Sequence, residues 1–229
     1  MNKKNIAIIV GAISVILIAS LGACYAFDLN LDIFGGPTTD FDTKFMSGTF
    51  IGDVSENKNN DTGSISDWTA SYEDKTNNIT YNMSCVKDGS FITDLYMLQG
   101  LGAPEVRNYN DVPWKIFYSQ AVPDTNATND TNSSSNSTIN VYICEADIND
   151  TAYTINVIAY NDEPECDGTL FCPLYQENIE PLVKSIEFKD SKKAPEMYDI
   201  LNMSKEEFEF NREYINGILN GTIDPSQLQ

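Results

Sequence analysis

Residues 139–160, INVYICEADI-ND-TAYTINVIAY, hold the strongest structural pattern in the chain. Two runs rich in β-branched and aromatic residues flank Asn149-Asp150, a pair that suits a tight hairpin turn. We therefore predict antiparallel strands over 139–148 and 151–160, with Ile148 opposite Thr151. Alternation of side chains along a strand then specifies an apolar face. This face consists of Tyr142, Cys144, Ala146, Tyr153, Ile155, Val157 and Ala159, and the opposite face is mixed.

Further elements are predicted on both sides of this hairpin. Strand patterns occupy 48–54, 68–72, 79–86, 114–122 and 185–188, and Asn82 is expected to face solvent from the third of these strands. Apolar residues at helical spacing predict helices over 89–100 and 175–184, with Pro181 weakening the second one. The fold class expected is α+β, in which an antiparallel sheet and flanking helices form an ectodomain over 45–190 that follows an N-terminal transmembrane helix. Residues 123–138, rich in Asn, Ser and Thr, read as a disordered insert within it.

The C-terminal residues 191–229 are predicted to be a helical tail. Ser204 and Glu207 are spaced as a capping box, and Phe208, Ile215 and Leu219 form a narrow apolar stripe that ends at Asn220-Gly221. We expect this helix to pack on the domain, with contact to a partner as the alternative.

The N-terminal segment 6–27 has no charged residue and follows Lys3 and Lys4. As a helix it would be about 33 Å long, which is enough to cross a hydrocarbon core of ~30 Å. The lysines favour a cytoplasmic N-terminus. We therefore predict a transmembrane anchor over 1–27 and a stalk over 28–44. Two alternatives stay open: a cleaved signal peptide, and lipidation of Cys24, because residues 21–24 (LGAC) resemble a lipobox.

The composition excludes several functions. All 34 acidic residues but only 12 of the 14 basic ones follow Phe27, so this part has a formal charge of −22. Such a surface repels nucleic acid. The chain has no histidine, which removes His-assisted nucleophiles and His-ligated metals. No catalytic, cofactor-binding or metal-binding residue is predicted.

Two groups of residues are candidates for covalent modification or cross-linking. N-glycosylation sequons occur at Asn60, Asn78, Asn82, Asn126, Asn129, Asn132, Asn136, Asn149, Asn202 and Asn220. Four cysteines follow the anchor, and four cysteines allow three connectivities. We consider a bridge between Cys166 and Cys172, and one between Cys85 and Cys144, whose alternative is two buried free thiols.

Three stretches resemble uncharacterised exported proteins of methanogenic archaea: FMSGTFIG at 45–52, MLQG at 97–100 and EPLVKSI at 180–186. The resemblance covers about residues 42–220, and that group has no assigned activity. The order of elements is also distantly similar to the PsbP-like α/β/α sandwich. That likeness implies a lipid- or membrane-tethered accessory module rather than an enzyme.

We therefore expect a membrane-tethered, glycosylated, non-catalytic accessory or binding module of the cell envelope, with an envelope protein or glycan as partner. One alternative is a carboxylate-dependent hydrolase of envelope polysaccharide, which needs two Asp or Glu side chains flanking a cleft. Another is a structural envelope protein.

Overall fold

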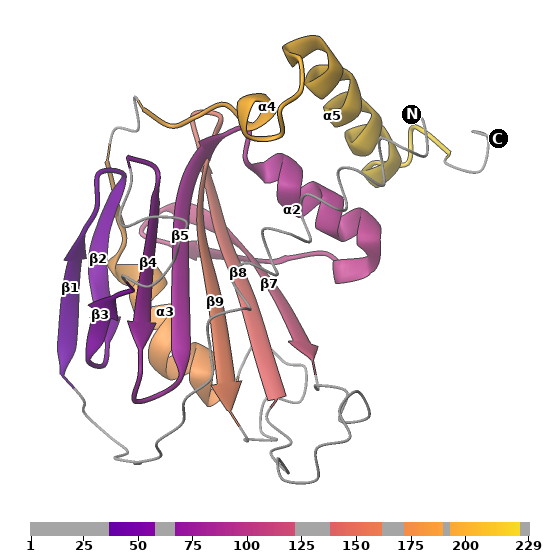
Figure 1. Cartoon of the computed structure of the whole chain (residues 1–229). Coiled ribbons are helices and arrows are strands. Elements are labelled where there is room, and N and C mark those ends of the chain that lie inside the picture. Colours follow the sequence, from indigo (N-terminus) through magenta and orange to yellow (C-terminus); the bar gives the residue numbers. More distant parts are fainter. Residues whose placement is uncertain (1–36, 58–66, 122–137, 162–171, 190–192, 225–229) are drawn as a thin grey trace, which may run out of the picture.

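The computed structural model describes residues 37–57, 67–121, 138–161, 172–189 and 193–224. Over these ranges the chain forms two antiparallel sheets with short flanking helices (Figure 1). This arrangement confirms the expected α+β class. The anchor predicted for 1–27 lies outside the described residues, as do residues 123–137 of the insert predicted for 123–138; Thr138 begins β8. Among the helices within them, none has both the length and the apolar character needed to cross a membrane.

The larger sheet has seven strands in the order β3-β4-β5-β9-β8-β7-β6. These strands are β3 (Val54–Glu56), β4 (Thr69–Asp74), β5 (Ile79–Lys87), β6 (Glu105–Tyr109), β7 (Val112–Ala121), β8 (Thr138–Ile148) and β9 (Thr151–Asn161). The smaller sheet has the order β1-β2-β10 and contains β1 (Thr38–Asp42), β2 (Met46–Ile51) and β10 (Glu187–Phe188). It therefore pairs the beginning of the described chain with a strand from near its end.

The hairpin of β8 and β9 has the predicted register, with Ile148 opposite Thr151. Asn149 and Asp150 form its turn at φ 51° and 60°, a left-handed conformation that these two residue types tolerate better than most others. All of the residues predicted for the apolar face are buried. The hairpin prediction is confirmed in its turn and face, and each strand extends one residue beyond the predicted outer end.

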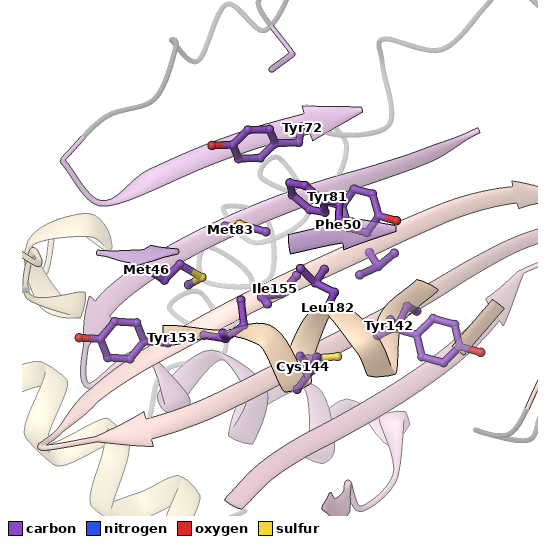
Figure 2. Close-up of a cluster of buried hydrophobic side chains, with 14 of the residues drawn as sticks. Met46, Phe50, Tyr72, Tyr81, Met83, Tyr142, Cys144, Tyr153, Ile155 and Leu182 are labelled. Atoms are coloured by element: carbon purple, nitrogen blue, oxygen red, sulfur yellow. The ribbon is translucent and has the colours of Figure 1, made fainter. Parts of the chain in front are cut away.

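The main core lies between this face of the large sheet and a layer made of the small sheet and the helical segment 175–185. Figure 2 shows side chains of the large sheet, such as Met83, Cys144 and Ile155, gathered with Phe50 of β2 and Leu182 of the helix. Ile179, Leu182 and Val183 are buried, as predicted.

The predicted helix 175–184 consists of two helical segments of different type, which meet next to Pro181. The chain forms a π-helical turn, η2 (Tyr175–Ile179), followed by α3 (Glu180–Ser185), and Pro181 lies in the first turn of α3. A proline has no N–H and clashes with the carbonyl four residues earlier, so a regular α-helix cannot run through it. The first turn of a helix tolerates proline because its N–H groups are unpaired there.

A second, smaller core lies on the other face of the large sheet. It involves α2 (Ser90–Tyr96), the π-helical turn η1 (Met97–Leu101), α4 (Met197–Ile200) and α5 (Lys205–Leu219). The buried members are Val86, Phe91, Leu95, Met197, Phe208 and Ile215. Ser204 caps α5 by accepting a hydrogen bond from the Glu207 amide at 3.2 Å. The expectation that this helix packs on the domain is confirmed.

Several elements predicted from the sequence need correction. The single strand predicted over 48–54 is two strands in different sheets, because β2 ends at Ile51 and β3 begins at Val54. Residues 38–42, assigned to the stalk, form β1 and pair with β2 over its whole length, because Phe41 contributes to the main core. The segment 105–109 was not predicted as a strand. It forms β6, joined to β7 by Asn110 and Asp111 at φ 52° and 63°.

Candidate functional site

The most unusual polar group in the described residues is the carboxyl of Glu145. It lies on β8, on the face of the sheet covered by α2, and is only 1% exposed. Lys115 is directly opposite on β7. Its Nζ lies 3.2 Å from Glu145 Oε1 and 2.6 Å from Asp147 Oδ2. Thr93 of α2 is 2.9 Å from Glu145 Oε2, so the cluster connects the helix to the sheet.

Burial controls the protonation of this cluster. Burial, followed by the charge of Asp147, raises the pKa of Glu145 to about 7, against the opposing effects of Lys115 and Thr93. Burial also raises the pKa of Asp94, on the same helix as Thr93. For Lys115, burial lowers the pKa, but its bonds to Asp147 and Glu145 outweigh this and leave a raised value. The Glu145 carboxyl therefore changes its protonation near neutral pH.

This cluster lies away from two surface cavities of the described chain. One, of about 280 Å³, lies where β5 and the β8–β9 turn meet α4 and α5; its lining includes Asp88, Asp150 and Arg212. The other, of about 440 Å³, lies along the C-terminal half of α5 beside Phe210. Neither cavity is lined by Glu145, Asp147 or Asp94. The residues with raised carboxyl pKa values therefore lie outside both of these cavities.

The smaller cavity is bordered by ion pairs between elements. Arg212 of α5 contacts Asp88 at 2.5 Å, and Lys87 of β5 contacts Glu196, just before α4, at 2.6 Å. These pairs hold the C-terminal helices against the end of the large sheet. In the described residues, no group of three or more carboxylates or cysteines is arranged to hold a metal ion.

A tyrosine cluster fixes β6 to α3 on the main-core side of the sheet. The hydroxyl of Tyr109 is 3.1 Å from that of Tyr175 and donates to Glu180 at 3.1 Å. Lys184 pairs with Glu180 at 2.8 Å and lies over the Tyr109 ring. Burial and the bond to Tyr109 raise the pKa of Tyr175. All four side chains have partners within the cluster, so its role is to position β6.

Of the two disulfides considered from the sequence, the Cys85–Cys144 bridge is contradicted by the structure, and the Cys166–Cys172 bridge lies partly outside the described residues. Cys85 and Cys144 are both buried, and neither is in a disulfide. They lie on β5 and β8, and β9 runs between these strands, so the predicted bridge between them is wrong. Cys172 is in a disulfide, and the Tyr142 hydroxyl donates to its sulfur at 2.9 Å. Cys166 and the lipidation candidate Cys24 lie outside the described residues.

Five of the sequons lie in described parts of the chain. Asn78, Asn149 and Asn202 occupy turns at φ 53°, 51° and 52°, and Asn149, Asn202 and Asn220 are exposed. Asn82 is half-buried on β5, where its side-chain oxygen accepts a bond from Ser71 at 2.9 Å. The others, Asn60, Asn126, Asn129, Asn132 and Asn136, lie outside the described residues.

Comparison with known proteins gives no family assignment. No protein-family model matches the chain, and no curated protein matches it. A crystal structure from Bacteroides thetaiotaomicron VPI-5482 is similar over 70% of this chain, with 9% identity and a TM-score of 0.41. The chain covers 51% of that protein, about half its length. A likeness of this size does not establish a common fold.

Proposed function

We propose that this protein is a membrane-tethered accessory or binding module of the cell envelope, with its N-terminus in the cytoplasm and its folded domain outside. The observation that carries the proposal is the uncharged segment 6–27 behind Lys3 and Lys4. The disulfide at Cys172 supports it, because such bonds persist in oxidising compartments. The exposed sequons at Asn149, Asn202 and Asn220 suit glycan attachment outside the cell.

The layers of the domain support the finer proposal of a PsbP-like sandwich. The large sheet carries α3 and the small sheet on one face, and α2 and α5 on the other. In Figure 1, α3 lies behind the sheet, and α2 and α5 lie to one side of it. Domains with that fold generally serve as tethered accessory modules, and a fold alone does not specify an activity.

The contacts of the polar cluster are those of a structural group, and this favours a non-catalytic role for the protein over hydrolysis. Glu145, Lys115 and Asp147 bond to one another and to α2, and this arrangement favours a structural use of their charges. The hydrolase of envelope polysaccharide stays the second candidate, because a carboxyl with a pKa of about 7 is suited to act as a general acid. Replacing Glu145 by Gln would abolish such an activity and leave a binding role unaffected.

Protease protection of the full chain tests the proposed location. With a C-terminal tag, the protein in intact cells should lose the tag to added protease, whereas in inside-out vesicles the tag should be protected. Alkaline carbonate should leave the chain in the membrane. A chain recovered intact from cytosol would contradict the proposal.

The accessory role is tested by chemical cross-linking in intact membranes. We expect the tagged full chain to be isolated with a discrete envelope protein or glycan, identified by mass spectrometry. Purified full chain should release no sugar from envelope polysaccharide. Release of sugar that E145Q abolishes would favour the hydrolase instead.

A further inference from the structure

β6 is an edge strand with an exposed apolar residue at its centre. It is the last strand of the large sheet, and no other strand in the described ranges pairs with its outer side. Val106 is 57% exposed, the second highest value among the large hydrophobic residues that stand exposed. Edge strands of this kind are a ready template for pairing with another chain.

The tight turn after β6 defines which of its backbone groups point outward. Asn110 and Asp111 are the turn, so Tyr109 and Val112 on either side of it form a hydrogen-bonded pair. Bonded and non-bonded pairs alternate along an antiparallel ladder. Because Tyr109 is bonded to β7, the backbone groups of Val106 and Asn108 point towards the outer edge.

Pro113 is consistent with this assignment. It lies opposite Asn108 in the register of β6 and β7, at a position where β6 needs no N–H from its neighbour. Proline has no N–H, so a sheet tolerates it only at a position where no backbone hydrogen bond to the neighbouring strand is lost.

The residues of β6 are complementary to themselves when two copies run antiparallel. We propose that the protein forms a two-fold symmetric dimer through β6, with Val106 opposite Val106 of the second copy. In that register Glu105 of each copy lies opposite Arg107 of the other. The two Val106 residues exchange both backbone bonds, and Asn108 of each copy donates its N–H to the carbonyl of Pro104 in the other.

The charges of Glu105 and Arg107 favour this register over registers shifted along the strand. A shift that places Arg107 opposite itself would bring like charges together, and directly opposite like charges destabilise a sheet. Within one chain, Arg107 already forms an ion pair with Glu105. In the dimer each of these side chains keeps that neighbour and gains an opposite charge across the two-fold axis.

The Tyr109 cluster makes β6 a rigid docking strand. Tyr109 and Lys184 hold the strand against α3 from the inner side, so pairing requires no rearrangement of the core. An interface made of two five-residue strands is small by the standard of stable dimers. If both copies are tethered to one membrane, as the proposed function states, their effective concentration is higher. The pairing itself does not depend on this tether.

Cysteine cross-linking of the full chain in membranes tests the register. In the proposed dimer the two Val106 Cα atoms lie about 5.5 Å apart, within the range of a disulfide. V106C should therefore form a covalent dimer on mild oxidation. N108C is the matched control, because its two copies lie roughly 14 Å apart in this register. It should cross-link no more than the wild type, which accounts for the native cysteines.

Charge reversal gives an independent readout. E105R in the V106C background places arginine opposite Arg107, and we expect about fivefold less covalent dimer. E105R/R107E exchanges the two charges and should restore the yield, with unfolding temperatures unchanged because both side chains are partly exposed. Equal cross-linking of V106C and N108C, or no effect of E105R, would overturn the dimer. Since neither result depends on which side of the membrane the domain faces, failure here leaves the proposed function intact.

Discussion

Glu145 accepts hydrogen bonds from two polar neighbours, and its pKa is raised in spite of them. The Thr93 hydroxyl donates to Glu145 Oε2 at 2.9 Å, and Lys115 donates to Oε1 at 3.2 Å. Both bonds favour the carboxylate, but burial, together with the charge of Asp147, outweighs them and raises the pKa to about 7. Glu145 is therefore sensitive to pH near neutrality.

We predict that the contribution of Glu145 to stability falls as the pH rises from 4.5 to 7, so that the wild type loses stability relative to E145Q over this interval. In that interval the folded state holds a proton on Glu145 that the unfolded chain has released, so higher pH favours unfolding. The loss relative to E145Q should be roughly 3 kcal/mol. Urea unfolding of the detergent-solubilised chain, followed by the fluorescence of the buried Trp114, measures it.

D147N is the control for this prediction. Asp147 is exposed, and removing its charge lowers the pKa of Glu145 because that charge contributes to the raised value. The pH dependence of stability should then move to lower pH without disappearing. Parallel curves for the wild type and E145Q would show that Glu145 is ionised throughout.

The sequence placed Glu145 on a mixed face but gave no reason to single it out. Its burial depends on α2 and on the opposition of Lys115, and that opposition is a long-range pairing between β7 and β8. The available signal was an acidic residue between Cys144 and Ala146, which both belong to the predicted apolar face. Without the strand order, nothing in the sequence indicated which cation would lie opposite.

At the scale of elements, tight turns connect two of the strand pairs in the large sheet. The hairpin turns 110–111 and 149–150 each consist of an Asn-Asp pair with positive φ. The second was predicted from the apolar runs around it. The first was not, because β6 is short and follows directly after Gly100, Gly102 and Pro104, which indicated only the end of a helix. Short strands with mixed composition are defined by their partners rather than by their own pattern.

Substitutions at Asp150 should distinguish the contribution of the turn's backbone conformation to stability from that of the Asp150 side chain. D150V places a β-branched residue at φ 60°, and we expect it to lower the free energy of unfolding by about 1–2 kcal/mol. D150G produces an Asn-Gly turn, the pair most favoured in such hairpins, and should be at least as stable as the wild type. Urea unfolding at pH 7 measures both. A destabilised D150G would mean that the carboxyl, which lines the smaller cavity, matters more than the backbone.

Two phenylalanines on α5 test how that helix is attached. Phe208 is 1% exposed and its ring centroid lies 4.8 Å from that of Phe91, so F208A should cost about 3–5 kcal/mol. Phe210 lies on the same helix but is 60% exposed, and F210A should change stability by less than about 0.5 kcal/mol. Thermal unfolding of the two variants gives the comparison. A small effect of F208A would show that α5 is loosely attached.

The whole molecule is a sheet with two unequal cores, and only part of that plan follows from local sequence. Alternation along β5, β8 and β9 predicted which side chains enter the main core. The strand order did not follow, because β9 pairs with β5 across the intervening residues 88–150. Cys85 and Cys144 show the consequence: both were placed on apolar faces, yet the intervening strand separates them.

The state of the cysteines gives a prediction for the whole chain in its compartment. In the folded protein, Cys85 and Cys144 should resist iodoacetamide because both are buried and burial raises the pKa of Cys144 to about 12. Denaturation without reductant should expose both to labelling, whereas Cys172 should take label only after reduction. Peptide mapping of the unreduced chain would identify the partner of Cys172, for which Cys166 stays our prediction. Labelling of Cys172 in the unreduced, denatured protein would place the chain in a reducing environment and remove one support for export.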